Sequence, residues 1–172
     1  MSDLPRTPYH TVCVSGGFDP VHVGHVRMIE EASQHGHVVV IVNSDEWLMR
    51  KKGYIFMPYD ERREILEALA TTGETTSVDD RDGTVCEALR RIKPDYFANG
   101  GDRKTDNTPE MKVCEELDIK LLWNVGGGKI QSSSTLVTDA GMLSETAEDE
   151  ELKPSRVEIM QSGDIPKKPR NY

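Results

Sequence analysis

The 172-residue chain lacks long apolar runs and has few cysteines. Its longest β-branched block, residues 38–42, is far shorter than the roughly 18 apolar residues that a membrane-spanning helix needs, so we expect no membrane insertion. The three cysteines are widely spaced and form no CxxC pair, which favours buried free thiols over a disulfide framework or a zinc site. Residues 1–8 carry no apolar segment like that of a secretory signal, and we therefore expect a cytoplasmic protein.

Basic residues are also scarce relative to acidic ones. The chain has 21 Lys and Arg against 30 Asp and Glu, a net charge of −9. Such a chain has no long-range attraction for nucleic acid, so we expect no nucleic-acid partner, and any bound phosphate must be met by local groups. A chain of this length corresponds to one domain at roughly 100 to 200 residues per domain. We therefore expect one catalytic module.

Short β-branched runs alternate with helix-period segments between residues 10 and 141, a pattern typical of βαβ units. It predicts an α/β fold with a doubly wound, Rossmann-like, five-stranded parallel sheet. The expected strands are residues 10–15, 37–43, 75–78, 95–98 and 119–125. The expected helices are residues 22–33, 59–70, 109–117 and 133–140. One more helix is expected to be capped by Asp82 or Thr84 and to end at Ile92.

The same pattern divides the chain into three parts. Residues 1–9 are expected to be an N-terminal extension, residues 10–141 the folded domain, and residues 142–172 a mobile or peripheral tail. The tail contains an acidic run, prolines and a basic end with little periodicity, which is the reason for separating it from the domain.

The strongest chemical signal is the segment GGFDPVHVGH, residues 16–25, between the first expected strand and helix. Gly16 and Gly17 let the backbone approach a ligand, and His22 and His25 lie three residues apart on the first helical turn. Free N–H groups and partial positive charge at a helix N-terminus suit phosphate oxygens. The segment therefore predicts a phosphate site. The alternative is that His22 caps the helix and His25 packs in the core.

The motif HVGH resembles the HxGH signature of the cytidylyltransferase-like nucleotidyltransferases. Further segments that resemble the family occur in the family's order over residues 10 to about 141: VNSD at 42–45, KKG at 51–53, Pro58 with Glu61 and Arg62, NGGD at 99–102 and SSST at 132–135. Within the family, these elements are most similar to the heptose-1-phosphate adenylyltransferase branch, and glycerol-3-phosphate cytidylyltransferase is a more distant relative.

The resemblance implies a doubly wound sheet with ligands at the carboxyl ends of its strands. It also implies a reaction in which a substrate phosphate oxygen attacks the α-phosphorus of a nucleoside triphosphate and pyrophosphate leaves. Transfer of AMP from ATP to a phosphorylated sugar or polyol is favoured, with Mg²⁺ accompanying the nucleotide and a homodimer as the expected assembly. One alternative is a cytidylyltransferase that uses CTP and glycerol 3-phosphate or another polyol or alcohol phosphate. An alternative of another class is a non-catalytic nucleotide-binding or scaffold protein.

The resemblance also assigns roles to individual residues. The catalytic residues are His22, His25 and Lys52. The acceptor substrate is expected to contact Lys51 and Arg62 and, at a departure from the family pattern, Lys129. No residue is assigned as a resident metal ligand. The nucleotide is expected to contact Gly16, Gly17, Phe18, Asp19, Gly24, Gly100, Asp102, Ser132, Ser133, Ser134 and Thr135.

Each assignment has a structural alternative. For the lysines the alternative is solvated surface charge, for Arg62 an ion pair with an acid, and for Asp19 an Asx turn. The four hydroxyl residues at 132–135 can simply cap the helix that follows them.

Two departures from the heptose branch affect the acceptor site. That branch tends to carry an arginine before its proline, whereas residues 54–58 here read YIFMP. The later loop, residues 125–131, is longer, has no acidic residue and adds Lys129. We therefore expect an acceptor pocket that lacks one phosphate contact and is reshaped around Lys129.

Overall fold

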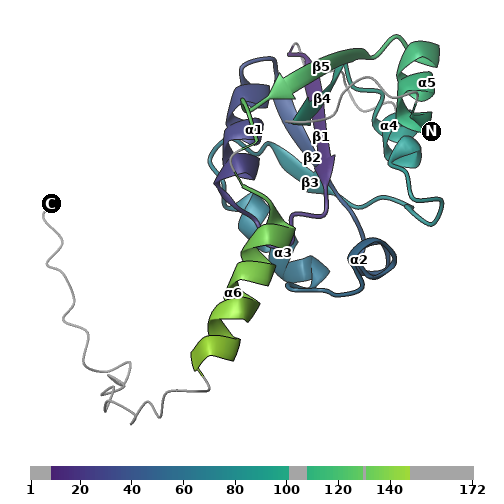
Figure 1. Ribbon diagram of the computed structural model, residues 1–172. Helices are drawn as coiled ribbons and strands as arrows, with labels where there is room; N and C mark the ends of the chain where they lie inside the picture. The colour runs from purple at the N-terminus through teal and green to yellow at the C-terminus, as the bar shows by residue number, and fades with distance from the viewer. Residues whose placement is uncertain (1–8, 101–107, 130, 148–172) are drawn as a thin grey trace, which may run out of the picture. The chain divides into compact units, whose positions relative to one another are not determined.

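A computed structural model describes residues 9–100, 108–129 and 131–147. Five parallel strands form one sheet in the order β3-β2-β1-β4-β5 (Figure 1), which confirms the predicted doubly wound fold. Strand β1 is central and pairs with β2 on one side and β4 on the other. The strands are β1 (Thr11–Gly16), β2 (His37–Val42), β3 (Glu74–Thr76), β4 (Tyr96–Gly100) and β5 (Lys120–Val125).

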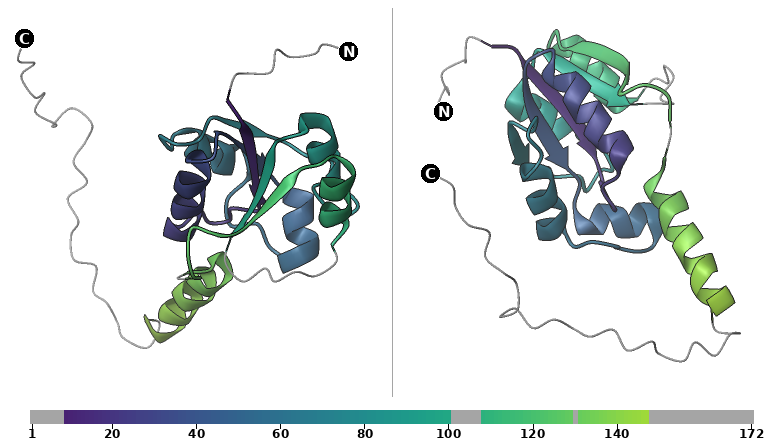
Figure 2. Two further views of the ribbon diagram at one scale, coloured as in Figure 1. Left: turned by 90° about the horizontal axis from the view of Figure 1, so that it is seen from above. Right: turned by 90° about the vertical axis from the view of Figure 1, so that its left-hand side faces the viewer.

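Helices cover both faces of this sheet. Five of them lie close to the predicted positions: α1 (Val23–Ser33), α3 (Tyr59–Glu67), α4 (Cys86–Ile92), α5 (Pro109–Glu116) and α6 (Ser133–Ala147), the last running seven residues beyond the predicted end at residue 140. Helix α1 lies on one face, and α4 and α5 lie on the opposite face (Figures 1 and 2).

Helix α2 (Asp45–Lys52) was not predicted. Its signals were nevertheless present: Ser44 caps the first turn by accepting the Trp47 N–H, and three basic residues occupy the last turn. Gly53 ends the helix at a φ of 80°, a left-handed conformation that glycine adopts readily. Lys52 therefore lies at the end of a helix, not in an irregular loop.

Alternation along the strands builds two cores. Val12 and Val14 of β1 face the core that α1 covers, whereas Cys13 between them faces α4 and α5. Cys13 and Cys114 are buried, as expected, and Cys86 is half-buried; all three are free thiols. Burial raises the pKa of Cys114 to about 11, so this thiol is protonated at neutral pH.

The chain separates into two compact units, one ending at Val137 and one beginning at Thr138. Within the described residues, the second unit consists of α6 from Thr138 to Ala147. The expected N-terminal extension up to residue 8, and the expected tail from residue 148 onward, lie outside the described residues, so the domain limits remain a prediction. Across the residues that the structure covers, no helix has the length and apolar character needed to cross a membrane.

Candidate active site

The two predicted histidines lie at the carboxyl end of β1, where the chain turns into α1. His22 is the N-cap residue of the helix, and its Nδ1 accepts a hydrogen bond from the Gly24 N–H at 3.1 Å. The His22 N–H in turn donates to Nδ1 of His25 at 3.2 Å. A Cβ at position 24 would lie 2.8 Å from the His22 ring, so the glycine between the histidines is required by close packing. The cap by His22, which was the structural alternative for this residue, is therefore present.

These backbone bonds fix the tautomers of both rings. An Nδ1 that accepts an N–H cannot carry a proton, so in each neutral ring the proton is on Nε2. The rings of His22 and His25 stack with centroids 3.8 Å apart, and the edge of Phe18 packs against His25 at 4.9 Å. Each ring thus has an Nε2–H donor whose orientation is set by the backbone and by its neighbours.

Burial keeps both histidines neutral. Desolvation is the larger cause that lowers the pKa of His22, and the nearby charge of Lys52 lowers it further. For His25, burial, His22 and Lys52 together lower the pKa to about 3. At neutral pH the pair therefore consists of uncharged hydrogen-bond donors.

Lys52 supplies the positive charge beside this pair. Its Nζ donates to the Asp19 carbonyl oxygen at 3.2 Å. Burial lowers the pKa of Lys52, and Asp19 opposes that shift. Lys51 lies elsewhere, with its Nζ 4.3 Å from the ring centroid of Trp47. The structure therefore places Lys52 where its charge acts on the histidines, and Lys51 over the Trp47 ring.

Asp19 was expected to contact the nucleotide, and the structure shows which partners its side chain has inside the protein. Its side chain is fully buried, and the two carboxylate oxygens accept the N–H groups of Phe56 at 2.8 Å and Met57 at 2.6 Å. Phe18, another expected nucleotide contact, is 2% exposed and supports His25. Both side chains therefore make contacts within the protein: Asp19 accepts backbone N–H groups and Phe18 packs against a ring.

Arg62 was expected to contact the acceptor, and its environment is also internal. The guanidinium is fully buried and donates to the carbonyl oxygens of Gly17, Asn43 and Met57 at 2.6, 2.9 and 3.0 Å. It also forms an ion pair of 2.7 Å with Asp45. Arg62 therefore ties together the loops that follow β1 and β2, and the alternative of pairing with an acid is present. A contact of Arg62 with the acceptor remains a prediction.

Sequence reasoning missed Asp80, which is 3% exposed. Its carboxylate accepts hydrogen bonds from the Asn43 side chain at 3.1 Å and from the Ser44 N–H and hydroxyl at 2.8 and 2.7 Å. The signal was an acidic residue shortly after the third strand, at the same edge of the sheet as the VNSD segment. Asp80 fixes the turn that follows β2 and so the start of α2.

The start of α6 adjoins the loop of the HVGH motif. Ser133 donates from its hydroxyl to the Pro20 carbonyl oxygen at 2.8 Å, and Ser132 caps the helix by accepting the Thr135 N–H at 3.1 Å. Simple capping, the structural alternative, is thus present. Ser134 and Thr135 are exposed, and so is Lys129 in the segment before the helix. Contacts of these side chains with a ligand remain predictions.

The expected ligand-contacting glycines at the strand ends are also places of tight packing. A Cβ on Gly17 would lie 2.8 Å from Leu48, and one on Gly100 would lie 3.0 Å from the Met28 sulfur. The nearest atom to a Cβ on Gly16 would be in the Phe18 ring, at an ordinary 3.4 Å. Asp102 lies outside the described residues.

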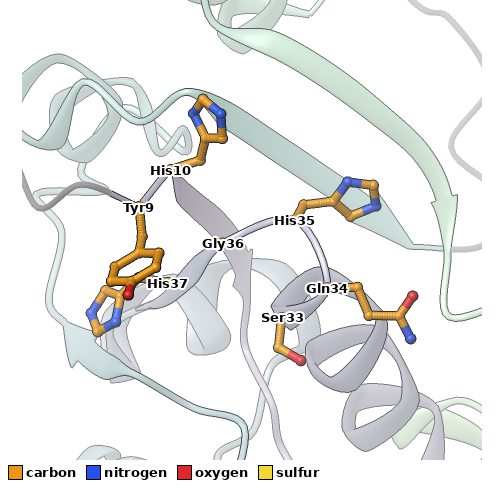
Figure 3. A pocket seen from close by; sticks show the side chains of 7 residues that line it. All are labelled: Tyr9, His10, Ser33, Gln34, His35, Gly36 and His37. Carbon is orange, nitrogen blue, oxygen red and sulfur yellow. The ribbon is translucent and has the colours of Figure 1, made fainter.

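A separate pocket of about 500 Å³ lies at the opposite, amino end of the sheet (Figure 3). Three histidines line it: His10 immediately before β1, His35 from the α1–β2 turn and His37 from the start of β2. Their rings point in different directions in Figure 3. Consistent with this, no three His, Cys, Asp or Glu side chains in the described part of the chain are grouped so that they could hold a metal ion.

Comparison with known proteins decides the family. Residues 13–153 match the family described as cytidylyltransferase-like. The chain belongs to this family. The resemblance drawn from HVGH and the segments that follow it is thereby confirmed.

Two relatives illustrate the relationship. An FAD synthase from Ferroglobus placidus is 36% identical over 106 residues, which are 62% of this chain and 66% of that protein. A D-beta-D-heptose 1-phosphate adenylyltransferase from Bordetella bronchiseptica is 33% identical over 114 residues, 64% of this chain and 69% of that protein. The chain thus spans just under two thirds of the FAD synthase it matches.

One solved structure supports the fold. The lipopolysaccharide core biosynthesis protein from Thermoplasma volcanium superposes with a TM-score of 0.56 at 23% identity, covering 67% of this chain and 95% of that one. At this identity the likeness concerns the fold alone.

Proposed function

We propose that this protein is a nucleotidyltransferase that moves AMP from ATP to a phosphate monoester and releases pyrophosphate. One observation carries the proposal: His22 and His25 are held neutral, with both Nε2–H donors oriented, at the N-terminus of α1 and in the electrostatic field of Lys52. Family membership supports the reaction class. One of the relatives described above is named an adenylyltransferase, and the other is named for FAD, which contains an adenylyl group. ATP is therefore favoured over CTP.

In the proposed reaction, an oxygen of the acceptor phosphate forms a bond to the α-phosphorus of ATP. The bond from that phosphorus to the bridging α–β oxygen breaks, and its electron pair leaves with pyrophosphate. No covalent enzyme intermediate is needed, because a correctly oriented phosphate is already a nucleophile. The chain therefore has to align two anions and stabilise the charge that moves to the leaving group.

The described residues divide this work between donors and a cation. Neutral imidazoles donate Nε2–H bonds to phosphate oxygens without transferring a proton, because a ring whose Nδ1 is bonded to a backbone N–H has no free basic nitrogen. Lys52 offsets negative charge as pyrophosphate leaves. Ser134 and Thr135, exposed at the start of α6, and the N–H groups there are proposed to hold the triphosphate from another side.

The proposed Mg²⁺ travels with the nucleotide. The described residues offer no cluster of three metal-binding side chains, and the buried carboxylate of Asp19 is occupied by two amides. In the part of the chain that the structure describes, the residues therefore do not fit a resident metal site, and we assign no step to the metal.

Two acceptor classes are candidates. The original candidate, a sugar or polyol phosphate, is supported by the likeness to the heptose 1-phosphate adenylyltransferase. A second candidate, FMN, is supported by the FAD synthase relative and by one feature of the chain. Ile55 and Phe56 are 38% and 55% exposed, and they stand where the heptose branch tends to carry an arginine. An apolar loop suits a flat aromatic acceptor better than a polyhydroxylated one.

A pyrophosphate-release assay tests the proposal. Four nucleoside triphosphates are combined with FMN, heptose 1-phosphate and glycerol 3-phosphate, and we expect release with ATP and one acceptor. Release with CTP and glycerol 3-phosphate would favour the cytidylyltransferase alternative. Nucleotide binding without release in any combination would favour the non-catalytic alternative. Sedimentation analysis of the same preparation tests the expected homodimer.

A further inference from the structure

Asp19 connects two segments that the proposed reaction needs together. Its carboxylate accepts the N–H groups of Phe56 and Met57, while its main-chain oxygen accepts Nζ of Lys52. The side chain is fully buried. A buried carboxylate is costly unless its lone pairs are satisfied, so these two amides are required to keep it in place.

The three contacts bracket one short stretch of chain. Lys52 ends α2, and residues 53–57 run from it to Met57, so the beginning and the end of this stretch are both bound to Asp19. Arg62 reinforces the arrangement by donating to the carbonyl oxygens of Met57 and Gly17. Asp19 lies three residues before His22, so the loop that carries the histidines and the segment that carries Lys52 are fixed to each other through this residue.

Asp19 is also the counter-charge of Lys52. Four described groups interact electrostatically with the Lys52 ammonium. Arg62 is positive, His22 and His25 are neutral, and Asp19 is negative. Burial and Arg62 lower the pKa of Lys52, whereas Asp19 raises it. Without the Asp19 carboxylate, desolvation and the charge of Arg62 would lower the pKa of Lys52 further and favour its uncharged amine.

We propose that Asp19 is a positioning residue that holds the Lys52 ammonium beside the His22–His25 pair. This inference rests on the proposed function, in which Lys52 stabilises the leaving pyrophosphate. In this proposal Asp19 acts through Lys52 and not by touching a substrate, because its side chain is fully buried and both carboxylate oxygens accept backbone N–H groups.

The first test needs no turnover. The rate at which Lys52 is acylated by trace acetic anhydride, followed by mass spectrometry in the unliganded protein, reports the fraction of uncharged amine at a given pH. In Asp19→Asn we expect this rate at pH 8 to rise about tenfold over wild type. Asp80→Asn is the matched control, because it also removes a buried carboxylate at this edge but has no contact with Lys52. An unchanged rate in Asp19→Asn, or an equal rise in Asp80→Asn, overturns the proposal.

The second test separates positioning from general stability. With the ATP-dependent assay, Asp19→Asn is expected to lower kcat about 10- to 100-fold, with a smaller change in the KM for ATP, and to move the alkaline limb of the kcat profile to lower pH. In a Lys52→Arg background the same substitution should leave the alkaline limb in place, since a guanidinium stays charged. A limb that moves equally in both backgrounds overturns the proposal.

If Asp19→Asn does not fold, Asp19→Glu takes its place, because it keeps the charge and lengthens the side chain by one methylene. The labelling rate should then stay within about twofold of wild type while kcat falls about tenfold; an unchanged kcat overturns the proposal. Should wild type show no nucleotidyl transfer, the proposed function fails, and the labelling experiment still decides the link between Asp19 and Lys52.

Discussion

The histidines at the two ends of the sheet differ in their hydrogen bonds and their ring contacts. At the carboxyl end, Nδ1 of His22 and of His25 is bonded to backbone N–H groups, and the rings stack on each other. At the amino end, His10 lies 3.5 Å from Asp95 and His37 lies 4.0 Å from Glu74, with histidine side chains 65% and 44% exposed. Only the first pair has its ring nitrogens oriented by the fold.

This difference shows why a hollow lined by histidines is weaker evidence of chemistry than a pair of oriented rings. The amino-end pocket is open, and ion pairs between exposed side chains typically contribute about 0 to 1 kcal/mol. The carboxyl end instead combines buried charges, Asp19, Arg62 and Asp80, with backbone bonds that set the loops. Preorganised donors of this kind are what electrostatic catalysis requires.

The largest expected effect is on stability. Arg62→Ala removes a buried cation and leaves the carbonyl oxygens of Gly17, Asn43 and Met57 without this donor, so we expect a loss of about 3–5 kcal/mol in the free energy of unfolding. Glu74→Gln at the amino end, which breaks an exposed pair with His37, should cost less than about 1 kcal/mol. Urea denaturation measures both, and equal losses would show that the two ends are held in the same way.

Substituting the oriented histidines should affect turnover strongly. His22→Asn and His25→Asn remove the Nε2–H donors, and we expect each to lower kcat about 10²- to 10³-fold. Asparagine at position 22 retains the ability to cap α1, so the helix start is preserved. His35→Asn is the control from the amino end and should change kcat less than twofold. Wild-type activity in folded His22→Asn or His25→Asn would remove the pair from the site.

Substitution of Lys52 should lower activity more than substitution of the adjacent Lys51. Lys52→Ala is expected to lower kcat about 10- to 100-fold, because it removes the cation beside the histidines. Lys51→Ala loses a cation–π contact with Trp47, typically about 0.5–1 kcal/mol, and should reduce activity less. Steady-state kinetics with ATP decide between them, and the reverse order would place Lys51 in the site.

A smaller effect is expected in the pH dependence of stability. Burial lowers the pKa of His25 to about 3, so between the unfolded value of 6.5 and about 3 the unfolded chain binds a proton that the folded protein does not. The contribution of neutral His25 to the free energy of unfolding is therefore fully present above pH 6.5 and is lost as the pH falls through this window. From pH 7 to pH 5, wild type should lose about 1–2 kcal/mol more than His25→Asn. Parallel denaturation curves for the two proteins at both pH values would contradict the burial of His25.

The sequence predicted most of the fold because the apolar periodicity is strong where strands and helices bury one face. The prediction failed at α2, where Leu48 is the one buried residue of an eight-residue helix and capping signals outweigh any apolar stripe. For the site, HVGH and Lys52 were identifiable from spacing and resemblance. The burial of Asp19 and Arg62 was not, because it depends on backbone groups from loops 38 and 45 residues away in the chain.

The central claim is that His22 and His25 are neutral Nε2–H donors, and ¹⁵N-resolved NMR of the histidine rings tests it most directly. The account predicts that both rings are Nε2–H tautomers at pH 7 and that His25 remains neutral down to pH 5, with a pKa of about 3. Either ring as an Nδ1–H tautomer, or a His25 resonance that titrates near pH 6.5, would contradict it.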